Sequence, residues 1–328
     1  MSTGRPKSKS WLIADIGGTR ARVGEVLEAS TEWHFVGEWE TAPFRDLADF
    51  LSTLGRRSDI SPTHVICAIA SPIRGDEVAL TNAGWRFSIE QTRKALGLNE
   101  LIIINDWVAQ GWAVAHAPDH ALTPIQLGEP MPQTPKLALG PGTGLGSALI
   151  TPKPDGWQVF ATEGGHMSFA ANNARETAIV ARIQARWGHC SGERLASGSG
   201  LANLYSVLGE IDGRNLDPLD AKAVSSAAQA NDPTAIEAIR LMTAALGSLA
   251  GDLALASGAR GGIYLGGGLI GALAKQFDES VFLERFSAKG RFREYLLAIP
   301  IYRMTLKNAA LYGLTVGLDA IRHQSRMN

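Results

Sequence analysis

The chain has 328 residues, of which 45% are hydrophobic and 19% are charged, and its formal net charge at pH 7 is -1. This composition is typical of a globular soluble protein, and the length suits two domains of about 150 residues each. The near-zero charge argues against nucleic acid as a partner, and two cysteines are too few for a disulfide framework, which favours a reducing cytoplasm.

The first predicted elements are three strands, and a glycine turn joins the first two. Residues 11–16 form an apolar strand containing Asp15, residues 21–27 form the second strand, and the third is centred on residues 33–36. The turn Gly17-Gly18-Thr19 lets the backbone approach a ligand, and its N–H groups can bind an anion. Asp15 can hold a hydrated cation nearby. An ordinary hairpin turn stays open as an alternative, because Gly-Gly-Thr alone is a weak signal.

Helices and strands are then predicted to alternate. A helix is expected at about residues 46–54, a buried strand around Cys67, a polar loop at Thr81-Asn82-Ala-Gly-Trp85, and a second helix at residues 89–96. Cys67 lies inside an apolar run and is expected in the core. This alternation after a meander predicts an α/β domain.

The most informative stretch is Leu101-Ile-Ile-Ile104, which is followed directly by Asn105 and Asp106. Four successive apolar residues predict a strand of a parallel sheet that is buried on both faces, and residues 107–116 predict a helix. A carboxylate at the carboxyl end of such a strand lies where open α/β sheets bind ligands. The alternative is that Asp106 only caps the helix, with Asn105 as a turn residue.

The second half of the chain begins with a second predicted meander of strands whose first turn is rich in glycine. Residues 115–135 are irregular and predict a hinge near their start. A strand at 136–139, the turn Gly140-Pro-Gly142-Thr143-Gly144, a second strand and a third at 157–161 follow, which suggests an internal duplication. No Gly-Lys-Ser/Thr follows, and the next element is a strand, so neither a P-loop nor a dinucleotide fingerprint is predicted.

Two loops of the second half carry polar side chains that suit a binding site. Glu163-Gly-Gly-His166 follows the third strand directly, and Ser191-Gly-Glu193-Arg194 follows a helix predicted at residues 177–187. The two glycines make a flexible corner that presents Glu163 and His166 in the same region. Two alternatives to a binding site stay open. Glu163 can be an exposed acid of an ordinary turn, and Glu193 can be an acid near the start of a helix.

The remaining chain is predicted to be mostly helical. Helices are expected at 201–208, 221–229, 233–256 and 309–322, and strands at 261–265 and 298–305. Asp252 interrupts the most apolar stretch, so a buried helix is expected there and not a membrane span. The run Gly266-Gly267-Gly268 can receive a flat ring or a phosphate. The closing helix is expected to return to the first domain, and no signal peptide is predicted at the N-terminus.

Taken in register, these motifs resemble those of the bacterial glucokinase family. The shared motifs between residues 11 and 318 are Asp15-Ile-Gly-Gly-Thr, Ile104-Asn-Asp, Gly140-Pro-Gly-Thr-Gly-Leu-Gly, Glu163-Gly-Gly-His, Ser191-Gly-Glu-Arg, Leu265-Gly-Gly-Gly and Lys289-Gly-Arg-Phe. Each motif is weak alone, but their common order is specific. The resemblance implies two ribonuclease-H-like (actin-like ATPase) α/β domains with a cleft between them, expected at 10–116 plus 307–322 and at 117–306.

The resemblance also implies a homodimeric enzyme that transfers the γ-phosphoryl group of ATP to the 6-hydroxyl of glucose. The implied sugar-binding residues are Asn82, Asn105, Asp106, Glu163, His166 and Glu193, with Asp106 as the general base. The implied nucleotide-binding residues are Asp15, Gly17, Gly18, Thr19, Gly142, Thr143, Gly144, Gly266, Gly267 and Gly268. Mg²⁺ would accompany ATP, with Asp15 acting on it through water and no direct protein ligand predicted.

The chain departs from the family pattern at two places. Arg20 stands where many members have Asn, and Met167-Ser168 replaces the more frequent Val-Asp. Arg20 would either strengthen ATP binding or be an ordinary surface arginine. The zinc-binding cysteine cluster of the related repressor–kinase family is absent, because the only cysteines are Cys67 and Cys190. A kinase for mannose, fructose or an N-acetylated amino sugar, and a non-catalytic sugar sensor, are the alternative functions.

Overall fold

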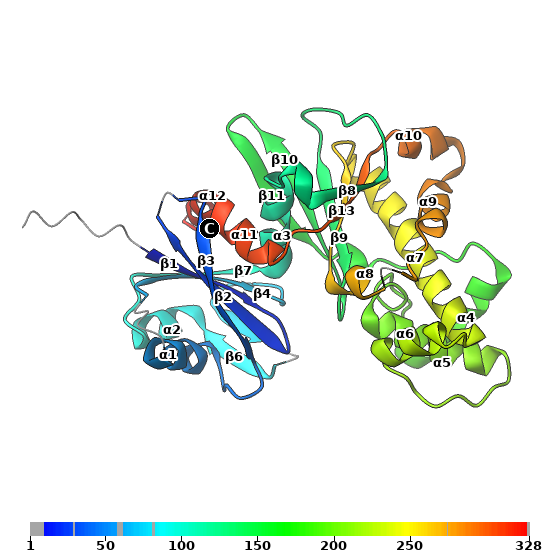
Figure 1. Ribbon diagram of the computed structural model, residues 1–328, viewed down its shortest axis with the longest axis horizontal. Coiled ribbons are helices and arrows are strands. Elements are labelled where there is room, and N and C mark those ends of the chain that lie inside the picture. The colour runs from blue at the N-terminus through cyan, green and yellow to red at the C-terminus, as the bar shows by residue number, and fades with distance from the viewer. Residues whose placement is uncertain (1–9, 29, 58–61, 81–82, 274, 327–328) are drawn as a thin grey trace, which may run out of the picture. The chain divides into compact units, whose positions relative to one another are not determined.

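The computed structural model describes residues 10–28, 30–57, 62–80, 83–273 and 275–326. The chain divides into two compact units, one made of Met1–Ala117 with Leu306–Asn328 and the other of Pro118–Thr305. Each unit is built around its own sheet, with helices packed against it (Figure 1). The predicted α/β class is therefore correct for both halves.

A five-stranded sheet forms the centre of the first unit, in the order β3-β2-β1-β4-β7. Its strands are β1 (Ser10–Ile16), β2 (Arg20–Leu27), β3 (Trp33–Glu40), β4 (His64–Ile69) and β7 (Glu100–Asn105). The first three form an antiparallel meander, and β4 and β7 continue the sheet in parallel. Every residue of β4 is buried, and so are residues 101–103 of β7, as their apolar runs predict.

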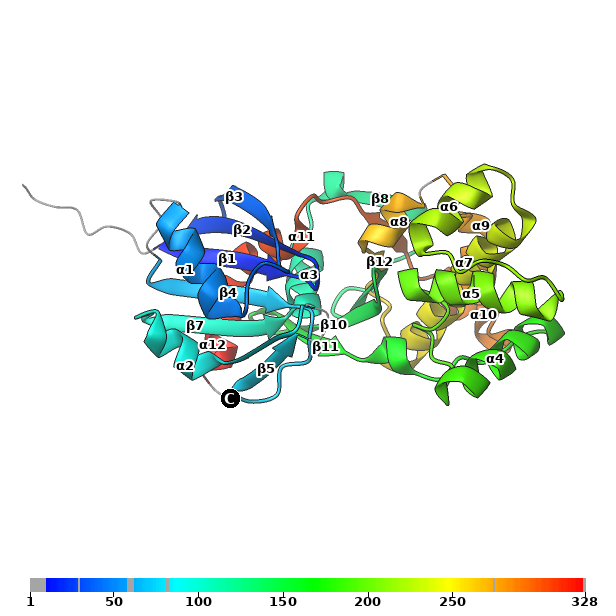
Figure 2. The same ribbon diagram turned by 90° about the horizontal axis from the view of Figure 1, so that it is seen from below.

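Helices cover both faces of this sheet. Figures 1 and 2 show α1 (Leu47–Arg57) and α2 (Ile89–Ala95) on one side and α11 (Ala309–Val316) and α12 (Leu318–Ser325) on the other. α11 packs closely on α3 (Asp106–Ala115), because a Cβ on Gly313 would lie 1.8 Å from the Ala109 carbonyl oxygen. The C-terminal segment thus returns to the first unit, as predicted, but as two helices.

A six-stranded sheet forms the centre of the second unit, in the order β11-β10-β9-β12-β13-β8. Its strands are β8 (Leu122–Gln126), β9 (Lys136–Pro141), β10 (Leu145–Lys153), β11 (Gly156–Thr162), β12 (Ile263–Leu265) and β13 (Ile301–Met304). An antiparallel meander followed by two parallel strands repeats the first sheet, as the predicted duplication requires. The additional edge strand β8 and the hairpin of β5 (Glu77–Leu80) and β6 (Trp85–Ser88) were not predicted.

The core of the second unit is built around the long helix α7 (Pro233–Ser257). The other helices are α4 (Ala174–Trp187), α5 (Gly198–Ile211), α6 (Ala221–Gln229), α8 (Gly268–Ala272), α9 (Glu279–Ser287) and α10 (Arg293–Leu297). α7 is long and apolar enough to cross a membrane, yet 72% of its most apolar window is buried inside the protein. Gly247 and Gly251 bring α9 into close contact, so α7 is a core helix as predicted.

A buried ion pair joins α4 to α9. Arg285 donates to both carboxylate oxygens of Glu176, and the two side chains are only 13% and 6% exposed. The Asn172 amide and the Asn173 side chain donate to the same carboxylate. Burial opposes ionisation of Glu176, but the bonds from Arg285 and Asn172 outweigh burial and hold its pKa below the usual range.

We expect Glu176→Gln to lower the free energy of unfolding by about 1–3 kcal/mol at neutral pH, because Arg285 stays buried without an anion. Because the pKa of Glu176 is lowered from 4.5 by folding, this stabilisation is present at pH values above 4.5 and is lost as the pH falls through the folded-state pKa. Urea unfolding at pH 7 and below pH 4 measures both effects. Glu210→Gln, in the more exposed pair with Arg186, is the control and should cost little. Equal losses in the two variants would contradict this assignment.

Candidate functional site

The first glycine turn connects β1 to β2 and leaves two adjacent amides available. The N–H of Gly17 donates to the Arg20 carbonyl oxygen at 2.9 Å, which closes the turn. Thr41 donates to the Gly18 carbonyl from its hydroxyl at 2.9 Å and to the Thr19 carbonyl from its amide at 3.1 Å. No atom of the described residues accepts a hydrogen bond from the amides of Gly18 or Thr19. Two successive unpaired N–H groups are the geometry that binds an anion.

Asp15 lies next to this turn, near the end of β1. Its carboxylate is 21% exposed and lies 3.6 Å from an Arg22 guanidinium nitrogen, while Arg22 donates to Glu38 at 2.7 Å. Burial raises the pKa of Asp15 to about 6, although the charge of Arg22 opposes the shift. Asp15 is therefore mostly ionised at neutral pH, and a cation nearby would favour that state further.

The carboxyl end of β7 presents Asn105 and Asp106, as predicted. Asn105 is the N-cap of α3: its Oδ1 accepts from the Trp107 amide at 2.9 Å, and its Nδ2 donates to the Ser71 carbonyl at 3.2 Å. Asp106 is the first residue inside the helix and is half-buried. The alternative in which Asp106 is the cap is thus wrong, because Asn105 caps the helix and fixes the position of Asp106. Asn82, the remaining predicted sugar ligand of this unit, lies outside the described residues.

The second glycine corner repeats the hydrogen bonding of the first. The Gly142 amide donates to the Gly144 carbonyl at 2.8 Å, and nothing among the described residues accepts from the amides of Thr143 or Gly144. The carbonyls of this corner are held by the start of α5, since the Gly198 amide donates to Gly142 at 2.8 Å. Ser199 Oγ likewise donates to the Thr143 carbonyl at 3.3 Å. This contribution of α5 was not predicted, because the sequence does not show which segments meet at the corner.

Glu163, His166 and Glu193 come together beside that corner. The His166 Nε2 lies 3.8 Å from a Glu163 carboxylate oxygen, and both side chains are exposed. The Glu193 amide donates to the Gly165 carbonyl at 2.8 Å, so the two predicted loops pair through their backbones. Glu193 does not cap α5, because Ser197 does.

The Glu193 carboxylate links the two predicted loops to the glycine corner. Its Oε2 accepts from the Leu145 amide at 2.9 Å, directly after Gly144. A Cβ on Gly165 would lie 2.3 Å from the Leu145 carbonyl oxygen, so the loop of Glu163 and His166 also packs on this residue. Leu145 therefore fixes both loops relative to the amides of the corner. The sequence motifs contain no sign of this connection.

The triple glycine packs against the same corner from the β12 side. The Gly266 amide donates to the Leu139 carbonyl at 2.9 Å. Gly267 has φ +88°, and a Cβ there would lie 2.4 Å from the Pro141 carbonyl oxygen, so only glycine fits. The helix that follows, α8, has five residues and is too short for its dipole to matter. The triple glycine thus contributes close backbone packing at the edge of the corner.

The described part of the chain contains no multi-ligand metal site. Within the described ranges no group of three or more His, Cys, Asp or Glu side chains could hold a metal ion. Cys67 is buried in the core, and burial raises its pKa to about 12, which makes the thiol inert. The lone carboxylate of Asp15 fits a Mg²⁺ ion that is held mainly by phosphate oxygens and water.

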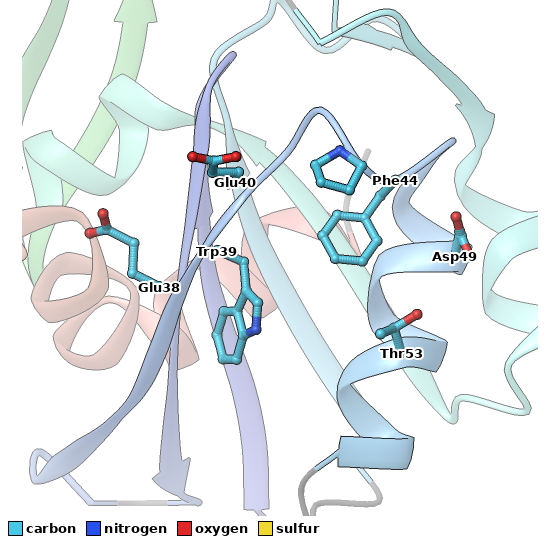
Figure 3. A pocket seen from close by; sticks show the side chains of 7 residues that line it. Glu38, Trp39, Glu40, Phe44, Asp49 and Thr53 are labelled. Atoms are coloured by element: carbon cyan, nitrogen blue, oxygen red, sulfur yellow. The ribbon is translucent and has the colours of Figure 1, made fainter.

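A pocket of about 580 Å³ lies elsewhere in the first unit, between β3 and α1 (Figure 3). Its lining residues are Glu38, Trp39, Glu40, Pro43, Phe44, Asp49 and Thr53. None of these is a predicted site residue, and the three carboxylates would repel a phosphate. We therefore assign no part of the nucleotide or sugar site to this pocket.

Comparison with known proteins extends the motif resemblance to most of the chain. The family model described as Glucokinase matches residues 12–321. A glucokinase of Chromobacterium violaceum is 40% identical over 97% of this chain and 92% of its own, and one of Nitrobacter hamburgensis is 39% identical over 92% and 95%. The crystal structure of a glucokinase from an Antarctic psychrotroph has a TM-score of 0.80 at 32% identity, over 95% of this chain and 99% of that one.

Proposed function

Because the chain belongs to the glucokinase family, we propose that its two glycine corners and five described polar residues, Asn105, Asp106, Glu163, His166 and Glu193, carry the phosphorylation of glucose. The chain has the function of its family, the ATP-dependent transfer of a phosphoryl group to glucose. The observation that supports the residue assignment best is the bond from the Leu145 amide to Glu193, which joins a predicted sugar ligand to a corner with two unpaired amides.

The sugar is recognised by carboxylate, amide and imidazole groups. In the first unit these are Asn105 and Asp106, and in the second they are Glu163, His166 and Glu193. Each of these groups pairs with hydroxyls, and a site built in this way rejects sugars that lack a hydroxyl. Asn105 uses one lone pair of Oδ1 for its helix cap and one N–H for the Ser71 carbonyl, so its contact to sugar would come from the second N–H or the second lone pair.

The phosphates of ATP are bound by backbone N–H groups. The amides of Gly18 and Thr19 serve in the first unit, and those of Thr143 and Gly144 serve in the second. Gly266, Gly267 and Gly268 give the adenosine close access to the backbone. Mg²⁺ would neutralise part of the phosphate charge, and Asp15 would orient its water ligands.

Asp106 acts as the general base. The 6-hydroxyl of glucose does not ionise at neutral pH, so a carboxylate accepts its proton as the oxygen–phosphorus bond forms. Such proton transfer typically contributes about 10²–10⁴-fold to the rate. The bond between oxygen and the γ-phosphorus forms, the bond from that phosphorus to the bridging oxygen breaks, and ADP leaves. The rest of the catalysis is positioning and charge stabilisation.

A hexose panel tests the function directly. We expect the highest kcat/KM with glucose when ADP formation is coupled to a colorimetric readout in the presence of ATP and Mg²⁺. One epimerised hydroxyl removes only one or two contacts, so mannose and other hexoses should react more slowly but measurably. A higher kcat/KM for mannose, fructose or an N-acetylated amino sugar would overturn the sugar assignment. Sugar binding without ADP formation would identify a sensor.

The cellular location and the oligomeric state of the protein are predictions that rest on its family. We propose a cytoplasmic enzyme, which agrees with the two buried free thiols, Cys67 and Cys190. We propose a homodimer, which sedimentation of the purified chain would test.

A further inference from the structure

Arg20 directly follows the glycine turn Gly17–Thr19, and backbone hydrogen bonds fix its position. Its carbonyl oxygen accepts from the Gly17 amide at 2.9 Å and so closes the turn. It is also the first residue of β2, where its register partner on β3 is Glu40. The Cα of Arg20 therefore cannot move independently of the amides of Gly18 and Thr19, which are assigned to phosphate.

The Arg20 side chain is held by a carboxylate that also holds a second arginine. Its Nη1 donates to Glu38 Oε1 at 2.8 Å, while Arg22 Nε donates to Glu38 Oε2 at 2.7 Å. Arg22 also lies 3.6 Å from Asp15. Each carboxylate oxygen of Glu38 thus accepts from a different guanidinium group, and each guanidinium group has further N–H donors.

The two arginines differ in how firmly they are held. Arg22 lies between the carboxylates of Asp15 and Glu38, whereas Arg20 is 64% exposed and, among the described residues, forms an ion pair with Glu38 alone. An exposed ion pair typically contributes only about 0–1 kcal/mol, so the Arg20–Glu38 contact costs little to break. A triphosphate presents several charged oxygens in the geometry that a guanidinium binds with two parallel bonds.

We propose that Arg20 is a phosphate-binding residue, which exchanges its contact with Glu38 for the phosphate chain when nucleotide binds at Gly17–Thr19. The proposal rests on the proposed function of that turn. Glu38 keeps Arg22 in place after Arg20 leaves, so Arg22 continues to balance Asp15. The interaction adds one positive charge next to the amides of Gly18 and Thr19.

The test compares three single variants with glucose at saturation. Arg20→Ala should raise KM for ATP about 3- to 10-fold and change kcat by less than about threefold, and Arg20→Lys should recover part of the loss because the charge returns without the two-bond geometry. The matched control is Arg45→Ala, because Arg45 is 87% exposed and paired with Asp49 in the same unit. Its KM for ATP should equal that of the unchanged protein.

A second measurement separates binding to phosphate from a structural effect. Glu38→Gln weakens the hold on Arg20 and should lower KM for ATP about twofold, but only while Arg20 is present. In the Arg20→Ala background Glu38→Gln should bring no gain. Thermal unfolding of each variant shows whether the fold is kept, and binding of ADP by calorimetry repeats the comparison without turnover.

The outcomes distinguish this proposal from the function on which it rests. If Arg20→Ala and Arg45→Ala both keep the original KM for ATP and affinity for ADP, Arg20 is a surface residue and the proposal is wrong. Gly18→Val should raise KM for ATP regardless of Arg20, because its side chain would obstruct the turn. An unchanged KM in Gly18→Val would instead overturn the assignment of the turn to phosphate.

Discussion

Replacing Asp106 by asparagine is expected to lower kcat at least about 100-fold while the Kd for glucose changes by less than about tenfold. Asparagine keeps the size of the side chain and one acceptor oxygen, but its NH₂ group only donates and the side chain cannot take up the proton of the 6-hydroxyl. Loss of a general base typically costs about 10²–10⁴-fold in rate. Because Asn105 and not Asp106 caps α3, the substitution leaves the helix cap intact. Steady-state kinetics give kcat, and calorimetry with glucose alone gives Kd.

The split between kcat and Kd is the decisive feature of this prediction, because a damaged fold would change both. Asp119→Asn is a suitable control, since Asp119 is an exposed acid at the start of the three-residue 3₁₀ helix Asp119–Ala121 and should tolerate the change. Near-normal turnover in Asp106→Asn would refute the role of Asp106 as general base. A loss of glucose binding with unchanged kcat would make it a sugar ligand only.

The sequence was most predictive where a local pattern determines both a strand and the residues directly after it. Residues 101–103 of the apolar run that forms β7 are buried as expected, whereas Ile104 is only partly buried, and Asn105 and Asp106 follow at the carboxyl end. The two glycine corners and the sheets around them were also predictable, because strand–glycine–strand is a pattern of adjacent residues. The choice between Asn105 and Asp106 as helix cap could not be made from the sequence, because both residue types are good caps and only the backbone geometry separates them.

Contacts between segments that lie far apart in the chain could not be predicted from the sequence. The hydrogen bond from Leu145 to Glu193 joins residues 48 positions apart in the sequence. The hydrogen bond from Gly198, at the start of α5, to Gly142 spans a similar separation in the sequence. Thr41 supports the first turn from the end of β3, where a single threonine carries no motif. The edge strand β8 was missed because Pro124 lies inside it, which is compatible with an edge position only.

The contact between Leu145 and Glu193 leads to a second prediction, in which Gly144 of the second glycine corner affects the affinity for glucose. Gly144→Ala is expected to raise the Kd for glucose about 30-fold. A Cβ on Gly144 would lie 2.5 Å from Glu193 Oε2, so the carboxylate must leave the Leu145 amide. Gly144 does not have a positive φ, so alanine itself adds no backbone strain. A hydrogen bond to a charged group is worth about 1.5–3 kcal/mol, and Glu193 would lose its fixed orientation with it.

Gly142→Ala is the matched control, because a Cβ there would meet nothing within 4 Å and its φ is not positive either. We expect it to leave the Kd for glucose within about twofold, whatever it does to ATP binding. Because Gly144→Ala acts through Glu193, it should add little to the loss in a Glu193→Gln background. Calorimetry with glucose on the unchanged protein, Gly144→Ala, Glu193→Gln and the double variant measures this coupling. Additive losses would mean that Gly144 affects the sugar by a route other than Glu193, and equal losses in both glycine variants would mean a general disturbance of the corner.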